Sequence, residues 1–294
     1  MAQSNDIWTI KAALDWTMGY LARKGDASPR VSAQRLMAHA CGLSRIELYT
    51  NLERPLSQNE RAVLRDYVKR RGEGEPLQYI VGEVGFRFLT LEVARGVLIP
   101  RPETEVLVSV LLQMLPEAEE GSMLRIADVG CGSGCIACSV ASERPDTHVY
   151  ALDIAPDALD LCQRNAERCG VADRVTVLES DMLSGLDDAL RGALDAIVSN
   201  PPYIPTSVLE EIPREVTDFE PTLALDGGED GLDAFRALLE VAPIMLKPHG
   251  ILAVELHEEC LDAAADLARE AGLVDVCVHQ DLAGKPRIAT ALRA

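Results

Sequence analysis

Residues 124–138 read LRIADVGCGSGCIAC, and this stretch decides the fold. Its first part is a short apolar segment typical of a buried strand, which ends at Asp128 and Val129. Three glycines follow at a spacing of two, and an apolar helical pattern begins at Cys135. Glycines between a strand and a helix permit a tight turn and let the backbone approach a ligand at the helix N-terminus. The stretch therefore predicts a nucleoside-type site in an α/β domain.

The cysteines of the same stretch offer a second interpretation. Cys131, Cys135 and Cys138 are spaced C-x3-C-x2-C, a pattern that can hold three irons of an iron–sulfur cluster. Such ligands must be exposed thiolates on a flexible loop, whereas Cys135 and Cys138 fall in the expected helix. Thiols in such places behave as small apolar residues. We therefore favour the glycine interpretation and predict no metal site.

Strands and helices alternate through the second part of the chain. Short apolar strands are expected at 124–130, 148–154, 174–180, 195–200 and 250–256, and helices at 101–115, 156–170, 231–246 and 261–272. This alternation indicates a parallel, doubly wound sheet. Residues 274–294 can add two strands as an edge hairpin, which brings the α/β domain, 101–294, to seven strands.

The first 75 residues have a helical pattern instead. Apolar residues recur at helical spacing in 32–43 and 57–71, and Ser57 with Glu60 three residues later is typical of a helix N-terminus. The stretch 76–100 contains alternating and β-branched residues, which favour a β-hairpin connector. We therefore expect a helical N-terminal domain at 1–75 and a connector at 76–100.

Composition limits the cellular context. The chain has 294 residues, is 48% hydrophobic, and contains no apolar run near the roughly 20 residues of a membrane span. It starts MAQSND, without the basic and apolar layout of a signal peptide. We expect a cytoplasmic monomer with no membrane contact, whose eight cysteines are reduced.

The charge is distributed unevenly between the two parts. Residues 1–100 hold 14 Lys and Arg against 11 Asp and Glu, whereas 101–294 hold 14 against 36, a balance of −22. A nucleic-acid binder neutralises phosphates with clustered Lys and Arg. We therefore expect no direct DNA binding, and a basic protein is the better partner, although the acidity can also serve solubility alone.

Two features beyond the glycines point to a nucleoside. Asp153 ends the next expected strand, 23 residues after Gly130, where an acid can accept both ribose hydroxyls. The sequence SDML at 180–183 follows the third strand and suggests a contact to an adenine edge. A dinucleotide would also satisfy the glycines and Asp153.

The stretch SNPPYIP, residues 199–205, lies at the end of the fourth expected strand and indicates the type of reaction. A rigid turn is the simplest explanation of two prolines after a strand. However, ligands of open α/β sheets bind at this edge of the sheet. The Asn200 side-chain oxygen and the Pro201 carbonyl can accept both N–H hydrogens of a planar nitrogen, while Tyr203 stacks on it. These residues suit methylation of an amide or aryl amine.

The motifs together resemble a known family. DVGCGSG, ALDIAP, SDML and SNPPYIP are similar to the motifs of class I S-adenosylmethionine-dependent methyltransferases with a Rossmann-like domain that act on glutamine amides. GEPLQYIVGEVGF, VLIPRPETEVLV, FEPTLALDGGEDGLDAFRALL and DLAGKPRIA are similar to stretches of the peptide chain release factor glutamine N5-methyltransferases. The resemblance runs from about residue 30 to residue 290, nearly the whole chain.

The resemblance implies S-adenosylmethionine as cofactor and the glutamine of the Gly-Gly-Gln loop of peptide chain release factors as substrate. It also implies that the helical N-terminal domain, 1–75, docks this substrate protein. It implies that Asn200, Pro201 and Tyr203 are catalytic and that Pro202 completes the substrate clamp. The implied cofactor contacts are Asp128, Gly130, Cys131, Gly132, Ser133, Gly134, Asp153, Asp181, Met182 and Asn200. The chain departs from the family where it reads VELHEEC at 254–260, in place of a glutamate-led E-I-G stretch, and where Cys131 and Ser133 replace threonines.

Other functions stay open at this point. A ribosomal-protein glutamine methyltransferase would share these motifs, and a DNA adenine methyltransferase can use the same Asn-Pro-Pro-Tyr chemistry on a flipped base. A nucleoside-binding module without turnover would not need the acceptor clamp. We assign no strong base, with His257 the nearest candidate, and interpret Arg101, Glu103 and Glu105 of PRPETE as structural.

Overall fold

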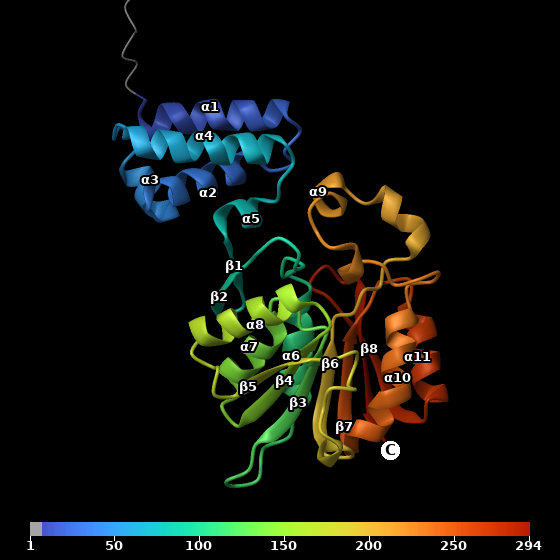
Figure 1. Cartoon of the computed structure of the whole chain (residues 1–294). Coiled ribbons are helices and arrows are strands. Elements are labelled where there is room, and N and C mark those ends of the chain that lie inside the picture. The colour runs from blue at the N-terminus through green and yellow to red at the C-terminus, as the bar shows by residue number, and fades with distance from the viewer. Residues whose placement is uncertain (1–7) are drawn as a thin grey trace, which may run out of the picture. The chain divides into compact units, whose positions relative to one another are not determined.

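The structure of the protein is a computed structural model that describes residues 8–294 (Figure 1). These residues form two compact units. One contains the chain up to Gly82 together with Arg214–Phe219, and the other contains Glu83–Pro213 and Glu220–Ala294. None of the helices among residues 8–294 is long and apolar enough to span a membrane.

The N-terminal unit is helical. Its helices are α1 (Ile10–Arg23), α2 (Pro29–Cys41), α3 (Arg45–Thr50), α4 (Gln58–Gly72), α5 (Leu77–Val81) and the later α9 (Arg214–Thr217). The expected N-terminus of α4 is confirmed, because Ser57 and Glu60 form a capping box that satisfies two backbone N–H groups. Buried apolar side chains from α1, α2 and α4 form the core of this unit, among them Ile10, Leu36 and Leu64.

Arg71 of α4 ties α9 to this unit. Its guanidinium pairs with Asp26 at 2.7 Å and with Glu215 at 2.7 Å, and the Arg71 and Asp26 side chains are both buried. Buried, bidentate arginine–carboxylate pairs fix geometry more firmly than exposed pairs do. The segment Arg214–Phe219, although distant in sequence, is therefore part of the helical unit.

The expected hairpin connector is shorter than predicted. Residues 77–81 form α5, and only β1 (Glu83–Phe86) and β2 (Leu89–Glu92) pair as an antiparallel hairpin. Leu77 and Ile80 of α5 join the helical core, and Gly82 ends the helix with φ +83°. A short apolar run cannot be assigned to helix or strand by its period alone, which explains the error.

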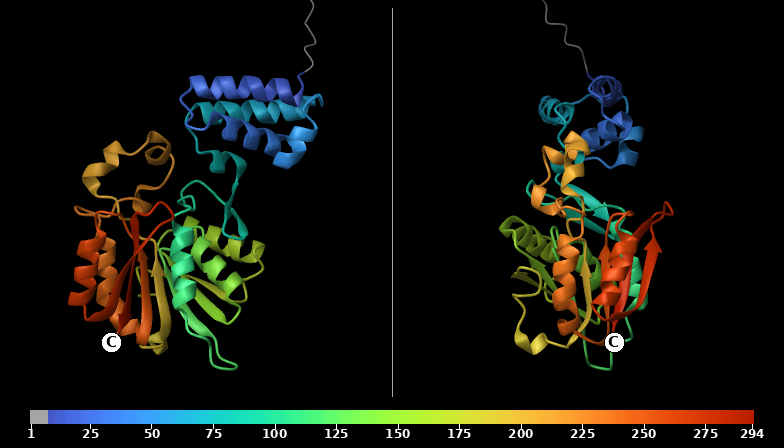
Figure 2. Two further views of the ribbon diagram at one scale, coloured as in Figure 1. Left: turned by 180° about the vertical axis from the view of Figure 1, so that it is seen from behind. Right: turned by 90° about the vertical axis from the view of Figure 1, so that its right-hand side faces the viewer.

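The second unit contains the predicted seven-stranded doubly wound sheet. Its strands are β3 (Leu124–Val129), β4 (Thr147–Asp153), β5 (Val175–Glu179), β6 (Leu194–Ser199), β7 (Leu246–Glu255), β8 (Leu273–Gln280) and β9 (Pro286–Arg293). They are ordered β5-β4-β3-β6-β7-β9-β8. The first five are parallel, and β9 lies antiparallel between β7 and β8, so the expected C-terminal hairpin is confirmed with β8 at the edge. Figure 2 shows the sheet from behind and from the side.

Helices cover both faces of this sheet. They are α6 (Thr104–Met114), α7 (Cys135–Glu143), α8 (Pro156–Arg168), α10 (Asp233–Met245) and α11 (Leu261–Glu270), with short 3-10 helices at Asp188–Leu190, Thr206–Glu211 and Thr222–Ala224. Alternate residues of each strand enter two separate cores. Ile126 and Val198 pack with α6, α7 and α8, whereas Ala127 and Ile197 pack with α10 and α11. In Figure 2 (left), α10 and α11 lie apart from α7 and α8.

Helix α6 begins later than predicted. Pro102 precedes it and Glu103 is its N-cap residue, so the first helical residue is Thr104. The Thr104 side chain, in the first turn of this helix, is 1% exposed.

Candidate active site

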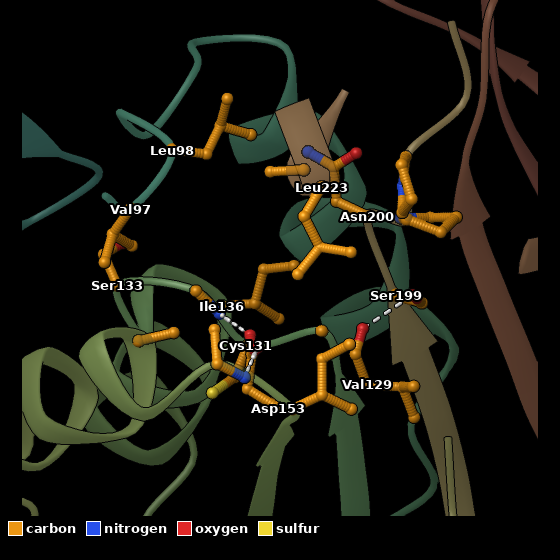
Figure 3. A pocket seen from close by; sticks show the side chains of 18 of the residues that line it. Val97, Leu98, Val129, Cys131, Ser133, Ile136, Asp153, Ser199, Asn200 and Leu223 are labelled. Atoms are coloured by element: carbon orange, nitrogen blue, oxygen red, sulfur yellow. Dashed lines mark hydrogen bonds between the residues drawn. The ribbon is translucent and has the colours of Figure 1, made fainter. Parts of the chain in front are cut away.

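The carboxyl ends of β3, β4, β5 and β6 line one cavity of about 280 Å³. The strand order reverses between β3 and β6, which is where open α/β sheets bind ligands. In Figure 3, Leu98 and Asn200 lie on the opposite side of this cavity from Asp153. Exposed apolar side chains contribute to its walls, including Ile154 and Leu223.

The glycine loop after β3 fits closely against α8. Gly134 has φ +76°, and a Cβ added there would lie 2.6 Å from the Cys162 sulfur. A side chain would therefore meet both backbone strain and a clash. The nitrogens of Gly130 and Cys131 donate to the Leu152 carbonyl at 2.8 and 2.9 Å, which holds the loop over the end of β4.

Asp153 fixes the loop from the neighbouring strand. Its Oδ2 accepts from the Gly132 N–H at 2.9 Å, and its Oδ1 accepts from the Ala155 N–H at 3.0 Å. Each carboxylate oxygen can accept more than one hydrogen bond, so Asp153 keeps acceptor capacity toward the cavity that it lines.

The cavity brings together most of the predicted site residues. They are Gly130, Cys131, Gly132, Ser133, Asp153, Asp181, Met182, Asn200, Pro201 and Pro202. Three predicted residues do not line it, namely Asp128, Gly134 and Tyr203. These three lie behind the cavity wall, where Gly134 shapes the loop and the other two make buried polar contacts.

Asp128 is fully buried beneath the glycine loop. Its Oδ2 accepts from the Ala137 N–H at 3.0 Å, in the first turn of α7, while Oδ1 is buried without a hydrogen-bond partner among the described residues. Burial raises the pKa of the Asp128 carboxyl to about 7; the Ala137 hydrogen bond lowers it and the charge of Asp153 raises it further. Asp128 therefore supports the loop from inside.

The Asn-Pro-Pro-Tyr stretch is anchored by two side-chain hydrogen bonds. The Asn200 Nδ2 donates to the Thr104 hydroxyl at 3.0 Å, and the Tyr203 hydroxyl donates to Glu255 Oε1 at 3.2 Å. Asn200 and Thr104 both line the cavity, and the Asn200 amide is drawn on its rim in Figure 3. Burial raises the pKa of Tyr203, so its hydroxyl stays protonated and serves as a donor.

Glu255 is the last residue of β7 and is fully buried. Burial raises the pKa of its carboxyl to about 7, while the nearby Thr104 hydroxyl, the hydrogen bond from Tyr203 and the charge of Arg287 lower it. Among the described residues, the other carboxylate oxygen, Oε2, has no hydrogen-bond partner. Glu255 opens the stretch ELH, in which the sequence departs from the family pattern, and it was not among the predicted site residues.

Sequence reasoning also missed two segments of the cavity wall. Residues 96–101 form one side, and Pro221, Leu223 and Ala224 form another. Arg101 joins the segments, because its guanidinium donates to Glu220 at 2.6 Å and Glu220 also accepts from the Ile99 N–H at 3.3 Å. Both segments belong to stretches that resemble the family, VLIPRPETEVLV and FEPTLALDG. However, the pattern of apolar residues in these stretches does not indicate which residues line the cavity.

The cysteines of the glycine stretch do not converge. Cys138 is fully buried and Cys135 half-buried on α7, and Cys131 is buried in the loop. Among residues 8–294, no group of three or more His, Cys, Asp or Glu side chains lies close enough together to hold a metal ion. The geometry therefore supports the glycine interpretation.

Comparison with known proteins agrees with this arrangement. Residues 12–82 match a family model described as the PrmC N-terminal domain, and residues 104–212 match the methyltransferase small domain. A release factor glutamine methyltransferase of Geobacter sulfurreducens is 43% identical over 288 residues, which cover 98% of each chain. The chain belongs to the release factor glutamine methyltransferase family. A family member from Moorella thermoacetica is 44% identical over 97% of this chain and 99% of its own.

Solved structures show the same fold at lower identity. A methyltransferase from Pyrococcus furiosus is 20% identical, with a TM-score of 0.51 over 69% of this chain and 88% of that one. The catalytic domain of hMettl16 is 15% identical, with a TM-score of 0.54 over 80% and 81%. The expected class I methyltransferase fold is thus confirmed, and residues 12–82 correspond to the N-terminal domain that the family model describes.

Proposed function

We propose that this protein transfers a methyl group from S-adenosylmethionine to the side-chain amide nitrogen of the glutamine in the Gly-Gly-Gln motif of peptide chain release factors. The observation that carries the proposal is that Asn200 and Pro201 line the same cavity as the glycine loop and Asp153. Relatives named release factor glutamine methyltransferase match over nearly the full chain, and they favour this amide over other planar nitrogens.

The cavity residues fit the cofactor. Asp153 has free lone pairs for the ribose hydroxyls, and Ile154 and Leu223 supply apolar surface for a flat base. Gly130 and Gly132 let the backbone approach a ligand without a Cβ in the way. Asp181 and Met182 line the cavity after β5, where the adenine edge is expected. The bound cofactor supplies an electrophilic methyl group on a positively charged sulfur.

The protein's own groups align the acceptor. A glutamine amide is a weak nucleophile because its nitrogen lone pair is delocalised. The Asn200 Oδ1 and the Pro201 carbonyl accept its two N–H hydrogens and fix the nitrogen toward the methyl group. The nitrogen bonds to the methyl carbon as the carbon–sulfur bond breaks, and one amide proton is released to water. A glutamate offers no donors to these acceptors, so we expect discrimination of about 10⁴-fold against it.

Replacing Asp153 by alanine is expected to weaken S-adenosylmethionine binding. The change removes the ribose acceptors and the hydrogen bonds to Gly132 and Ala155. The expected loss is about 1–3 kcal/mol in calorimetry of the free enzyme. Asp157→Ala, at the exposed start of α8, is the control and should leave the affinity unchanged. An Asp153→Ala variant that binds S-adenosylmethionine with wild-type affinity would show that Asp153 does not contribute to cofactor binding.

The activity is tested by incubating the protein with S-adenosylmethionine and a purified release factor. Mass spectrometry of the Gly-Gly-Gln peptide should show one added methyl group on the glutamine. A release factor with Glu in place of that Gln is the matched negative control. Methylation of a ribosomal protein, with no methylation of the release factor under the same conditions, would contradict the assignment and favour the ribosomal substrate.

We also propose that the N-terminal unit docks the release factor. The unit contains a groove of about 520 Å³ between α1 and α4. Trp16 stacks on Tyr20 with ring centroids 5.3 Å apart, and Trp16 is 50% exposed. Arg61, Arg65 and Lys69 also line the groove, and none of them has an ion pair among the described residues. This pairing of aromatic and cationic side chains suits an acidic, partly apolar segment of the partner.

Reversing two groove charges, Arg65→Glu with Lys69→Glu, is expected to raise the KM for the release factor about 10-fold. The KM for S-adenosylmethionine and kcat should stay near wild type, because charge complementarity governs encounter and not the chemical step. Arg30→Glu with Arg35→Glu places the same charge change on exposed positions of α2, outside the groove, and is the control. Equal KM values in the two double variants would exclude the groove as the docking site.

A further inference from the structure

Asn165 of α8 is fully buried, and both polar atoms of its side chain form hydrogen bonds. Its Nδ2 donates to the Ser133 carbonyl at 2.9 Å and to the Glu92 carbonyl at 3.0 Å. Its Oδ1 accepts from the Glu92 N–H at 2.7 Å. A primary amide carries two N–H donors and one carbonyl acceptor, so all of these groups are used here. One buried side chain therefore binds the glycine loop and the end of β2.

The glycine loop needs such an anchor because its own sequence does not fix its conformation. All three of its glycines have positive φ, and glycine adopts other backbone conformations about as readily. Asp153, which lines the cavity, holds the Gly132 N–H at 2.9 Å. Asn165, which does not line the cavity, holds the buried Ser133 carbonyl. A buried carbonyl without a partner is unfavourable, so this hydrogen bond favours one conformation of the loop.

The second anchored segment leads into another wall of the cavity. Glu92 ends β2, and residues 96–101 of the chain that follows line the cavity. Val97 of this wall is buried and packs against α8. A Cβ added at Gly132 would lie 3.8 Å from the Val97 side chain, so the wall lies close to the glycine loop. Figure 3 shows Val97 and Ser133 on the same side of the cavity. The same side chain of α8 thus holds two neighbouring parts of the cavity wall.

We propose that Asn165 is a positioning residue, which holds the glycine loop and the segment that leads into residues 96–101 in the conformation that binds S-adenosylmethionine. The inference rests on the proposed function, because it concerns the cofactor of that reaction. Asn165 acts through the backbone of Ser133 and Glu92 and not by contact with the cofactor. A loop that is already held in its binding conformation loses less conformational freedom when the cofactor binds, so the affinity is higher.

Asn165→Asp and Asn165→Ala test the proposal by calorimetry with S-adenosylmethionine. Aspartate keeps the shape of the side chain but sets a carboxylate against the two carbonyls, and alanine removes the whole amide. We expect each variant to raise the Kd for the cofactor about 10-fold or more, because the binding conformation of the loop is less populated. At saturating cofactor, kcat and the KM for the release factor should stay within about threefold of wild type, because the bound cofactor restores the loop.

Two exposed positions of the same helix supply matched controls. Gln163→Glu makes the same change from amide to carboxylate at the surface, and Arg168→Ala removes the ion pair of α8 with Glu83 of the hairpin. Both should bind S-adenosylmethionine as the wild-type protein does. An Asn165 variant that folds and binds the cofactor with wild-type affinity would overturn the proposal. A wild-type protein that does not bind the cofactor would instead contradict the proposed function.

A measurement on the wild-type protein tests the same link without any variant. Glu92 does not line the cavity, and its N–H donates to Asn165, so hydrogen exchange of this N–H reports the opening of that hydrogen bond. Cofactor binding should slow this exchange about 10-fold more than it slows exchange in β8, because the ordered loop then holds Asn165 in place. The N–H groups of β8, at the edge of the sheet, are the reference for general stabilisation. Slowing at Glu92 no greater than in β8 would refute the link.

Discussion

Replacing Asn200 by alanine is expected to lower kcat for release factor methylation by about 10³-fold or more. The change removes one of the two acceptors that hold the substrate amide in line with the methyl donor. Loss of one preorganised hydrogen-bonding group at a reacting centre costs about 10²- to 10³-fold in other enzymes. Here the loss also frees the Thr104 hydroxyl, which Asn200 now satisfies. The measurement is single-turnover methylation of a purified release factor.

The cofactor is expected to bind the Asn200→Ala enzyme with measurable affinity. Most of the cavity wall, including Asp153, Ile154 and the glycine loop, is untouched by the change. Calorimetry with S-adenosylmethionine therefore distinguishes a slower methyl-transfer step from a loss of cofactor binding. Asn51→Ala, at the end of α3 in the helical unit, is the control and should keep full activity. Turnover of Asn200→Ala within about 10-fold of wild type would exclude Asn200 as a catalytic residue.

Much of the catalytic fold could be predicted because its signals are local. A buried parallel strand is a short apolar run, and glycines mark the turn after it, so β3, β4, β5 and β6 were predicted at their observed positions. The position of β9 between β7 and β8 was not predictable in this way. The two terminal strands can form the same hairpin whether β8 or β9 pairs with β7. Which of the two pairs with β7 depends on the packing of the completed core.

The candidate site was predictable where a residue's role follows from its place at the end of a strand. Asp153 is the last residue of β4, Asn200 directly follows β6, and both line the cavity. Thr104 and Glu255 carry no such signal. Thr104 meets Asn200 across 96 positions in the sequence, and Glu255 reaches Tyr203 across 52. The sequence pattern of PRPETE suggests roles for its charged residues, although the uncharged Thr104 makes the hydrogen bond to Asn200.

Tyr203 makes a contact that its motif does not indicate. Its place in Asn-Pro-Pro-Tyr suggests that it stacks on the substrate, but its hydroxyl bonds to buried Glu255 and it does not line the cavity. Stacking on the substrate stays a prediction. The hydrogen bond to Glu255 gives Tyr203 a second task, which is to fix the end of the stretch that carries Asn200 and Pro201.

Replacing Asp128 by asparagine is expected to stabilise the cofactor-free protein, with a gain that begins near pH 4 and grows up to about pH 7. Burial raises the pKa of Asp128 from 3.8 to about 7 in the folded protein. Below about pH 3 the carboxyl is protonated in both the folded and the unfolded state, so its burial costs nothing. As the pH rises, the unfolded chain releases this proton first, so stability is lost until the folded pKa is passed. At pH 8 the penalty is nearly complete, at about 4 kcal/mol.

Asparagine avoids this penalty and can still accept from the Ala137 N–H with its amide oxygen. Urea unfolding at pH 5 and pH 8 should therefore show a gain from Asp128→Asn that grows with pH. Asp262→Asn removes an exposed carboxylate in the first turn of α11 and should give no such growth. Glu255 contributes pH dependence of the same sign, because burial also raises its pKa, but it does so equally in both proteins and cancels from the difference. A gain that is the same at both pH values would mean that Asp128 is ionised in the folded protein throughout this range, and that its burial beneath the glycine loop is compensated by other groups.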